Sequence, residues 1–209
     1  MSAFLGKIHY WLYNKIQLQE KLICDITVLA KEKGYAVEPL LEASYSSYGY
    51  PVIGELEEVI EHSNIHGWLQ EQIISVENRF AYVVTEIKKD NVITDTEIET
   101  IFYQDGLEHG KEYGNMQGSP EALFQLIFDY MLEGMPCDRV NNIITNTENE
   151  IIWETTRDLH KDYWDKVEGD LNLFYKGRIA WINGFLSATG TPYQYTLQDN
   201  RINEIRKVG

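Results

Sequence analysis

Ile8-His9-Tyr10-Trp11-Leu12 is a phrase that this chain repeats, 57 residues later, as Ile65-His66-Gly67-Trp68-Leu69. The same register aligns Ile16 with Ile73, Glu20 with Glu77 and Lys31 with Lys88, which makes seven identities in 24 ungapped positions. Histidine and tryptophan at fixed helical spacing are typical of either a binding site or a packing device. The repeat therefore indicates which residues bear on the fold and which are candidates for a binding site.

Apolar residues around both copies of the phrase follow the spacing of amphipathic helices. They recur every three to four positions over about residues 4–33 and again over 64–89, as on the buried stripe of a helix. A shorter helix is expected after each long one. Either an internal duplication relates residues 8–49 to 65–106, or two amphipathic patterns coincide.

The C-terminal half also has the pattern of helices. They are expected over residues 120–133, from 139 onward, over 147–167 and over 171–187, whereas residues 193–197 alternate like a lone strand. We therefore predict an all-α fold, a helical bundle with little or no strand, that forms a single domain over residues 1–209.

Local signals mark one helix start and one loop in the middle of the chain. Thr94 followed by Glu97 fits a capping box, which opens a helix to about residue 104. Four glycines then stand four residues apart, and each costs a helix about 1 kcal/mol relative to alanine. We therefore expect a loop over residues 105–119, around Gly106, Gly110, Gly114 and Gly118.

Composition and charge bound the class of protein. The chain is 44% apolar and 24% charged, as globular proteins are, and its net charge of −15 repels phosphate backbones and anionic lipid. We expect a soluble, cytoplasmic protein that binds neither nucleic acid nor membrane. Its expected partners are a small-molecule ligand, or a second copy that contacts the Tyr-rich loop 45–51 or the C-terminal tail.

The repeated histidines and glutamates are the leading candidate site. On a helical wheel His9 and Glu20 lie on one edge of the apolar stripe, about 16 Å apart along the helix, and His66 and Glu77 hold the same positions. Antiparallel pairing of the two long helices would bring His9 to Glu77 and Glu20 to His66. The four side chains then predict either a bundle-core site for a transition metal such as zinc or iron, or two structural His–Glu contacts in a non-enzymatic interaction module.

Two further histidines enter the metal hypothesis. His160 lies in an acidic stretch and is a candidate third ligand, or part of a solvated helix face. His62 and His66 are spaced i, i+4, which resembles the histidine pair in the last helix of DinB/YfiT-like metal-binding bundles. The pair stands near residue 65, however, and no other part of that pattern aligns, so no family is inferred.

Cys137 carries a third hypothesis, a thiol-dependent enzyme. It precedes an expected helix that begins at Arg139, and the positive end of a helix dipole favours thiolate. With a histidine supplied in space, Cys137 is then a candidate nucleophile. The alternative is a small side chain packed in a tight turn.

Overall fold

A computed structural model describes residues 5–114 and 118–208. Contacts divide the chain into two compact units, each of which is described by itself. The first comprises Met1–Ile93, Tyr130–Pro136 and His160–Gly169, and the second comprises Thr94–Asp129, Cys137–Leu159 and Asp170–Gly209. The single domain and the internal duplication stay predictions.

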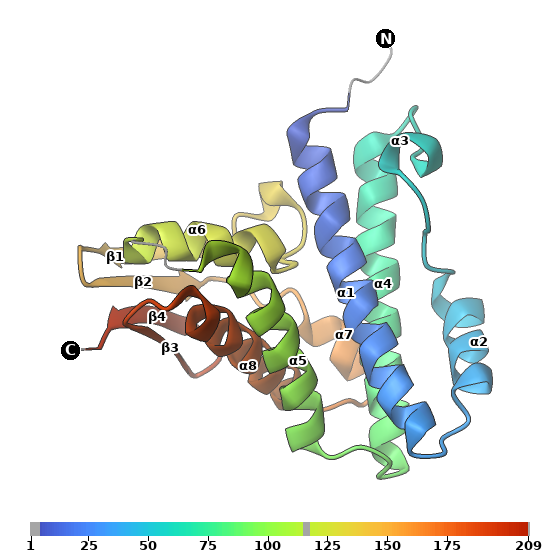
Figure 1. The fold of residues 1–209 in the computed structure, drawn as a ribbon. Coiled ribbons are helices and arrows are strands. Elements are labelled where there is room, and N and C mark those ends of the chain that lie inside the picture. The colour runs from blue at the N-terminus through green and yellow to red at the C-terminus, as the bar shows by residue number, and fades with distance from the viewer. Residues whose placement is uncertain (1–4, 115–117, 209) are drawn as a thin grey trace. The chain divides into compact units, whose positions relative to one another are not determined.

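Two long helices dominate the first unit, and their bounds agree with the expected ranges. Leu12 of the first copy of the phrase and Ile65 and Leu69 of the second copy are buried, and the Oδ1 of Asn64 caps the second helix by accepting the N–H of Gly67 at 3.2 Å. The unit consists of α1 (Lys7–Glu32), α2 (Val37–Tyr48), α3 (Leu56–Val59), α4 (Ile65–Lys89) and α7 (Lys161–Lys166), shown in Figure 1.

The two long helices run parallel, so the predicted antiparallel pairing is wrong. His9, at the start of α1, meets His66 at the start of α4, and Glu20 meets Arg79 halfway along. The connection over residues 33–64 explains the direction, because α2 and the extended segment after it carry the chain back along α1 (Figure 1). Side-chain donors of α1 hold that segment: Tyr13 donates to the carbonyl of Gly54 and Gln17 to the carbonyl of Val52.

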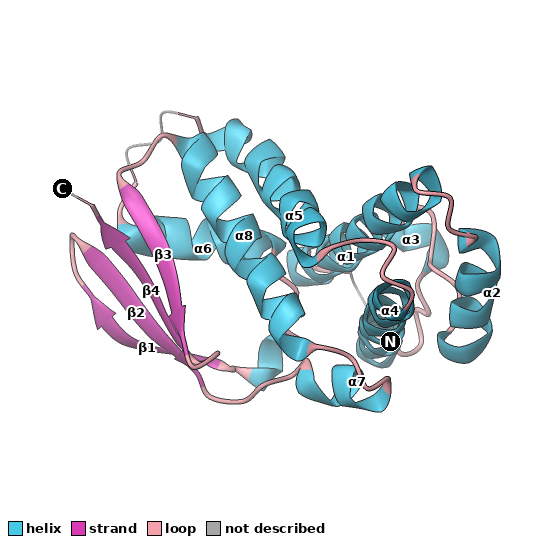
Figure 2. Cartoon of the chain, turned by 90° about the horizontal axis from the view of Figure 1, so that it is seen from below, coloured by secondary structure: helices cyan, strands magenta, loops and turns pink. Residues whose placement is uncertain are grey.

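The second unit combines helices with a sheet. Helices α6 and α8 lie against one face of the four strands (Figure 2). Trp153 is 1% exposed and packs edge-on against Phe124 of α6. The unit contains α5 (Asp95–Gly110), α6 (Pro120–Tyr130, whose last residue groups with the first unit), α8 (Leu171–Thr189), β1 (Asn141–Asn146), β2 (Glu150–Thr155), β3 (Tyr193–Gln198) and β4 (Ile202–Lys207).

The sheet is antiparallel, with strand order β1-β2-β4-β3. Ile151 pairs with Ile205, and Ile205 pairs with Tyr195, which gives a buried row across three strands. The other face carries ion pairs between strands, such as Arg206 with Glu150 at 2.9 Å. One face is therefore core and the other polar, as is usual for an antiparallel sheet under helices.

This sheet contradicts the predicted all-α fold class. Residues 141–155, expected to be helical, form the hairpin β1–β2, in which Ile151 and Trp153 point into the core. The tail expected to be a lone strand pairs with β4. Isoleucine-rich runs on either side of a short polar turn are a hairpin signal that outweighs the helical spacing seen there.

The predicted glycine loop is also wrong over its first half. Thr94 and Glu97 form the expected capping box, but α5 continues to Gly110. A methyl group on Gly106 would lie 2.0 Å from the carbonyl oxygen of Trp181 in α8, and one on Gly184 would lie 2.1 Å from the carbonyl oxygen of Tyr103 in α5. The two helices therefore approach so closely that glycine is required on each. Gly118 follows the undescribed residues 115–117 and has no helical assignment.

Within the described part of the chain, no helix has the length and apolar character needed to cross a membrane.

Candidate functional site

The structure brings the two histidines of the repeated phrase together. The Nε2 atoms of His9 and His66 are 3.1 Å apart, and the ring centroids are 5.2 Å apart. His9 is half-buried and His66 is exposed, so the pair lies at the open end of the two parallel helices and not in the bundle core. The parallel direction causes this meeting, because it places equivalent positions of the repeat side by side.

Hydrogen bonds fix the proton positions in this pair. The N–H of Gly6 donates to Nδ1 of His9 at 2.9 Å, so that nitrogen must offer its lone pair. Neutral His9 therefore carries its proton on Nε2 and donates it to Nε2 of His66. It follows that neutral His66 carries its own proton on Nδ1.

The surroundings of His9 favour its neutral form. Burial first, and then the neighbouring His66, lower the pKa of His9 below its ordinary value. Next to it, the hydroxyl of Tyr10 donates to Glu57 at 2.5 Å, which raises the pKa of Tyr10 and lowers that of Glu57. His62, the other half of the i, i+4 pair, is exposed and its Nε2 lies 3.2 Å from the carbonyl oxygen of Glu57.

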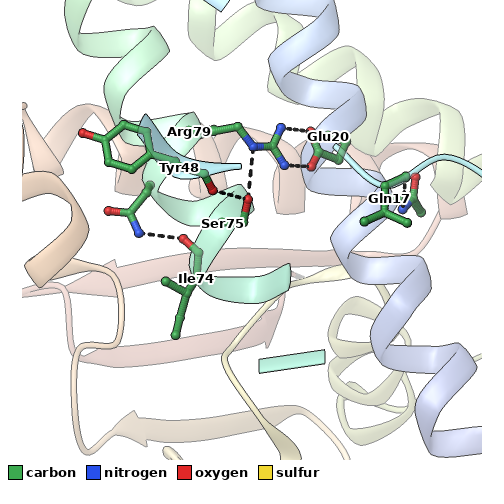
Figure 3. Close-up of polar contacts among 8 residues, drawn as sticks. Gln17, Glu20, Tyr48, Ile74, Ser75 and Arg79 are labelled. Carbon is green, nitrogen blue, oxygen red and sulfur yellow. Dashed lines mark hydrogen bonds and ion pairs between the residues drawn. The ribbon is translucent and has the colours of Figure 1, made fainter. Parts of the chain in front are cut away.

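The predicted contact between Glu20 and His66 is wrong. Glu20 instead forms an ion pair with Arg79. Nη1 and Nη2 of the Arg79 guanidinium donate to the two carboxylate oxygens of Glu20, and Arg79 is 2% exposed (Figure 3). Nε of Arg79 lies 3.4 Å from Oγ of Ser75, which in turn donates to the carbonyl of Tyr48 at 2.6 Å (Figure 3). This network joins α1, α4 and the end of α2, and it uses Glu20 as a structural counter-ion.

Glu77 likewise does not approach His9. Its Oε2 lies 3.2 Å from Nδ1 of His160, and both side chains are almost fully buried. Nε2 of His160 lies 3.9 Å from Glu133, so this imidazole stands between two carboxylates. Glu77 is eleven residues after His66 on α4, about 16 Å along the helix, so His160 cannot share an ion with the histidine pair.

The five predicted metal ligands thus separate into three places: His9 with His66, Glu20 with Arg79, and Glu77 with His160. Across residues 5–114 and 118–208, no group of three or more His, Cys, Asp or Glu side chains is arranged to hold a metal ion. The tryptophans of the phrase are packing residues, since the ring of Trp68 contacts Tyr13 and the ring of Trp11 lies under the ammonium of Lys15, 3.4 Å from the ring centre.

The helix expected after Cys137 is not present. A short 3₁₀ turn, Pro136–Asp138, leads instead to strand β1, and Cys137 is exposed. The helix dipole on which the thiolate hypothesis depended is therefore missing from this position. Cys24, the other cysteine, is also exposed and not packed in the core.

Sequence reasoning missed buried charged groups in both units, among them Arg79 and Asp105. Arg79 stands three residues after Val76 and four before Val83, so its place on the apolar stripe was a readable signal of a buried counter-ion. Asp105 of the second unit, 3% exposed, accepts the indole N–H of Trp181 at 2.8 Å and has Nε2 of His109 at 3.7 Å. This group joins α5 to α8, and no signal located it because its position was expected to be a loop.

Comparison with known proteins finds no matching family model, no matching curated protein and no matching solved structure.

Proposed function

We propose that this protein binds a transition-metal ion of the zinc class through Nε2 of His9 and Nε2 of His66. The 3.1 Å between these atoms carries the proposal. Two imidazole nitrogens bound to one tetrahedral zinc ion at 2.0–2.1 Å are about 3.3 Å apart, so an ion requires the rings to open by a few tenths of an ångström. The site belongs to the open end of the helices and replaces the core site expected from the sequence.

Ion binding requires a change of tautomer at His9. Zinc takes the Nε2 lone pair, so the proton must move to Nδ1, and the N–H of Gly6 then loses its acceptor. His66 needs no change, because its Nε2 already offers a lone pair. The hydrogen bond from Gly6 therefore opposes metal binding, by about 1 kcal/mol.

Some charges around the histidine pair oppose the binding of a cation, and others favour it. The histidines lie in the first turns of α1 and α4, where helix dipoles disfavour a cation. Carboxylates at the same end of the unit offset this effect. They are the exposed side chains of Glu55, Glu57, Glu58 and Glu61, one of which is held by Tyr10 next to His9.

Zinc titration by isothermal calorimetry tests the proposal. Because cysteine thiolates bind zinc and both cysteines are exposed, the reference protein is the full chain with Cys24→Ser and Cys137→Ser. We expect His66→Ala to weaken binding by at least about 100-fold, since the loss of even an outer-shell partner costs 10–100-fold. His62→Ala is the matched control and leaves binding unchanged. Equal affinity in His66→Ala, or no heat of binding in the reference protein, overturns the proposal.

Gly6→Pro provides a second, opposite test. Proline has no N–H, and the φ of −95° at Gly6 has the sign that proline requires, although it must change by about 30° to reach the usual −65°. Nδ1 of His9 is then released to take the proton, so zinc affinity should rise about fivefold. A gain of affinity cannot come from misfolding, and an unchanged or lower affinity contradicts the tautomer argument.

A second candidate function is a non-enzymatic interaction module. It is favoured by the segment after α2, where Ile53 is 86% exposed and Tyr50 is 61% exposed although Tyr13 and Gln17 hold the backbone in place. This function predicts that the protein self-associates as its concentration rises and that the association does not depend on metal ions. Sedimentation velocity of Ile53→Ser in chelator, compared with the unchanged chain, measures it. Monomers of both proteins at all concentrations contradict it.

A further inference from the structure

We infer that a second copy of this chain completes the zinc site, so that one ion bridges two protomers through four imidazoles. This inference rests on the proposed function. Zinc held by protein side chains alone takes four ligands in a tetrahedron. One chain presents two nitrogens at the required separation, and in its described residues no third ligand converges with them. Two coordination positions therefore remain open among the described residues, and we assign them to the same histidine pair of a second protomer.

The position of the pair allows a second chain to reach it. His66 is exposed on the first turn of α4. Ile8, which precedes His9, is 47% exposed although it lies on the first turn of an amphipathic helix. A two-fold axis through the ion would bring the same exposed residues of both copies together, as in an isologous dimer.

Charge makes the dimer conditional on the ion. Each chain has a net charge of −15, and the glutamates over residues 55–61 carry part of it to the same end of the first unit as the histidines. Two copies therefore repel each other unless a cation stands between them. Since salt screens repulsion between exposed charges, the zinc-bridged dimer should become tighter as ionic strength rises.

Stoichiometry separates this inference from simple zinc binding. A bridging ion saturates at about 0.5 zinc per chain, and excess zinc then splits the dimer because each chain acquires its own ion. Sedimentation velocity should therefore show monomer without zinc, dimer at half-equivalence, and monomer again in large excess. Chelator should return the half-equivalence sample to monomer.

The experiment uses the full chain with Cys24→Ser and Cys137→Ser, titrated with zinc chloride. His66→Ala should remain monomeric at every zinc concentration, whereas His62→Ala should dimerise like the reference protein. One zinc per chain in a persistent monomer overturns the bridged dimer and leaves the proposed function standing. A dimer that forms in chelator also overturns the inference, and no zinc binding overturns both proposals.

Discussion

Gly106→Ala should strongly destabilise the protein, although alanine is the better helix former. The new methyl group would lie 2.0 Å from the carbonyl oxygen of Trp181, where carbon–oxygen contacts closer than 3.0 Å are essentially never seen. Helices α5 and α8 must therefore separate by about 1 Å, which disturbs the reciprocal contact at Gly184 and the buried bond from Trp181 to Asp105. Overpacking typically costs about 1–3 kcal/mol, and a clash with backbone belongs at the upper end of that range, whereas the better helix propensity of alanine returns about 1 kcal/mol. We expect a net loss of about 2 kcal/mol.

Urea unfolding followed by circular dichroism measures this loss as a change in the free energy of unfolding. Gly114→Ala is the matched control from the same run of glycines, because its methyl group would meet no atom closer than 3.4 Å and its φ of −54° suits alanine. The control should be within about 0.5 kcal/mol of the unchanged chain. If Gly106→Ala were as stable as Gly114→Ala, the close approach of α5 and α8 would be wrong.

Three further predictions concern the first unit. Glu20→Gln leaves Arg79 buried without its counter-ion and should lower the free energy of unfolding by about 3–5 kcal/mol, whereas Glu20→Leu combined with Arg79→Leu should recover much of that loss in the same urea assay. The pKa of His9 is lower in the folded state than its unfolded value of about 6.5, so the unfolded state takes up the proton first as pH falls. Stability from His9 is therefore complete above pH 6.5 and is lost below it, and His9→Gln should flatten urea midpoints measured between about pH 7.5 and 5. His160→Ala removes a buried ring and its contact with Glu77, and should cost about 3 kcal/mol or more of unfolding free energy; a loss under about 1 kcal/mol would show that this pair is not buried as described.

Local chemistry in the sequence located most helices of the first unit. The apolar stripes around the repeated phrase predicted α1 and α4, and in the second unit the Thr94 capping box predicted the start of α5. These features depend on residues a few positions apart, whose contacts any helix would make. The direction of α4 relative to α1 depends instead on the path of residues 33–64, so these local features do not predict it.

Tertiary packing explains the failures in the second unit. Residues 141–155 contain apolar runs too short to distinguish helix from strand by spacing, and their pairing with β4 decides for strand. Gly106 looks the same in sequence as Gly114, and only the presence of α8 beside it makes glycine necessary. The strand at residues 141–155 and the need for glycine at position 106 therefore cannot be predicted without knowing that β4 and α8 lie beside them.

The sequence indicated the two histidines of the candidate site correctly, but it assigned the wrong contact partners to the histidines and to the glutamates. His9 and His66 were named from the repeat, and they meet, but as equivalent positions of parallel helices. Glu20 and Glu77 were named for the same reason, yet Glu20 contacts the buried Arg79 and Glu77 contacts the buried His160. Which side chain satisfies a half-buried charge depends on distant residues such as Arg79 and His160.

The central claim is that the Nε2 atoms of His9 and His66 share one zinc ion, and nitrogen NMR of the imidazole rings tests it most directly. Without zinc, His9 should carry its proton on Nε2, because the N–H of Gly6 occupies Nδ1. On addition of zinc, that proton should appear on Nδ1 while the Nε2 resonances of both histidines shift together. Unchanged ring resonances of His9 and His66 at saturating zinc would contradict the claim.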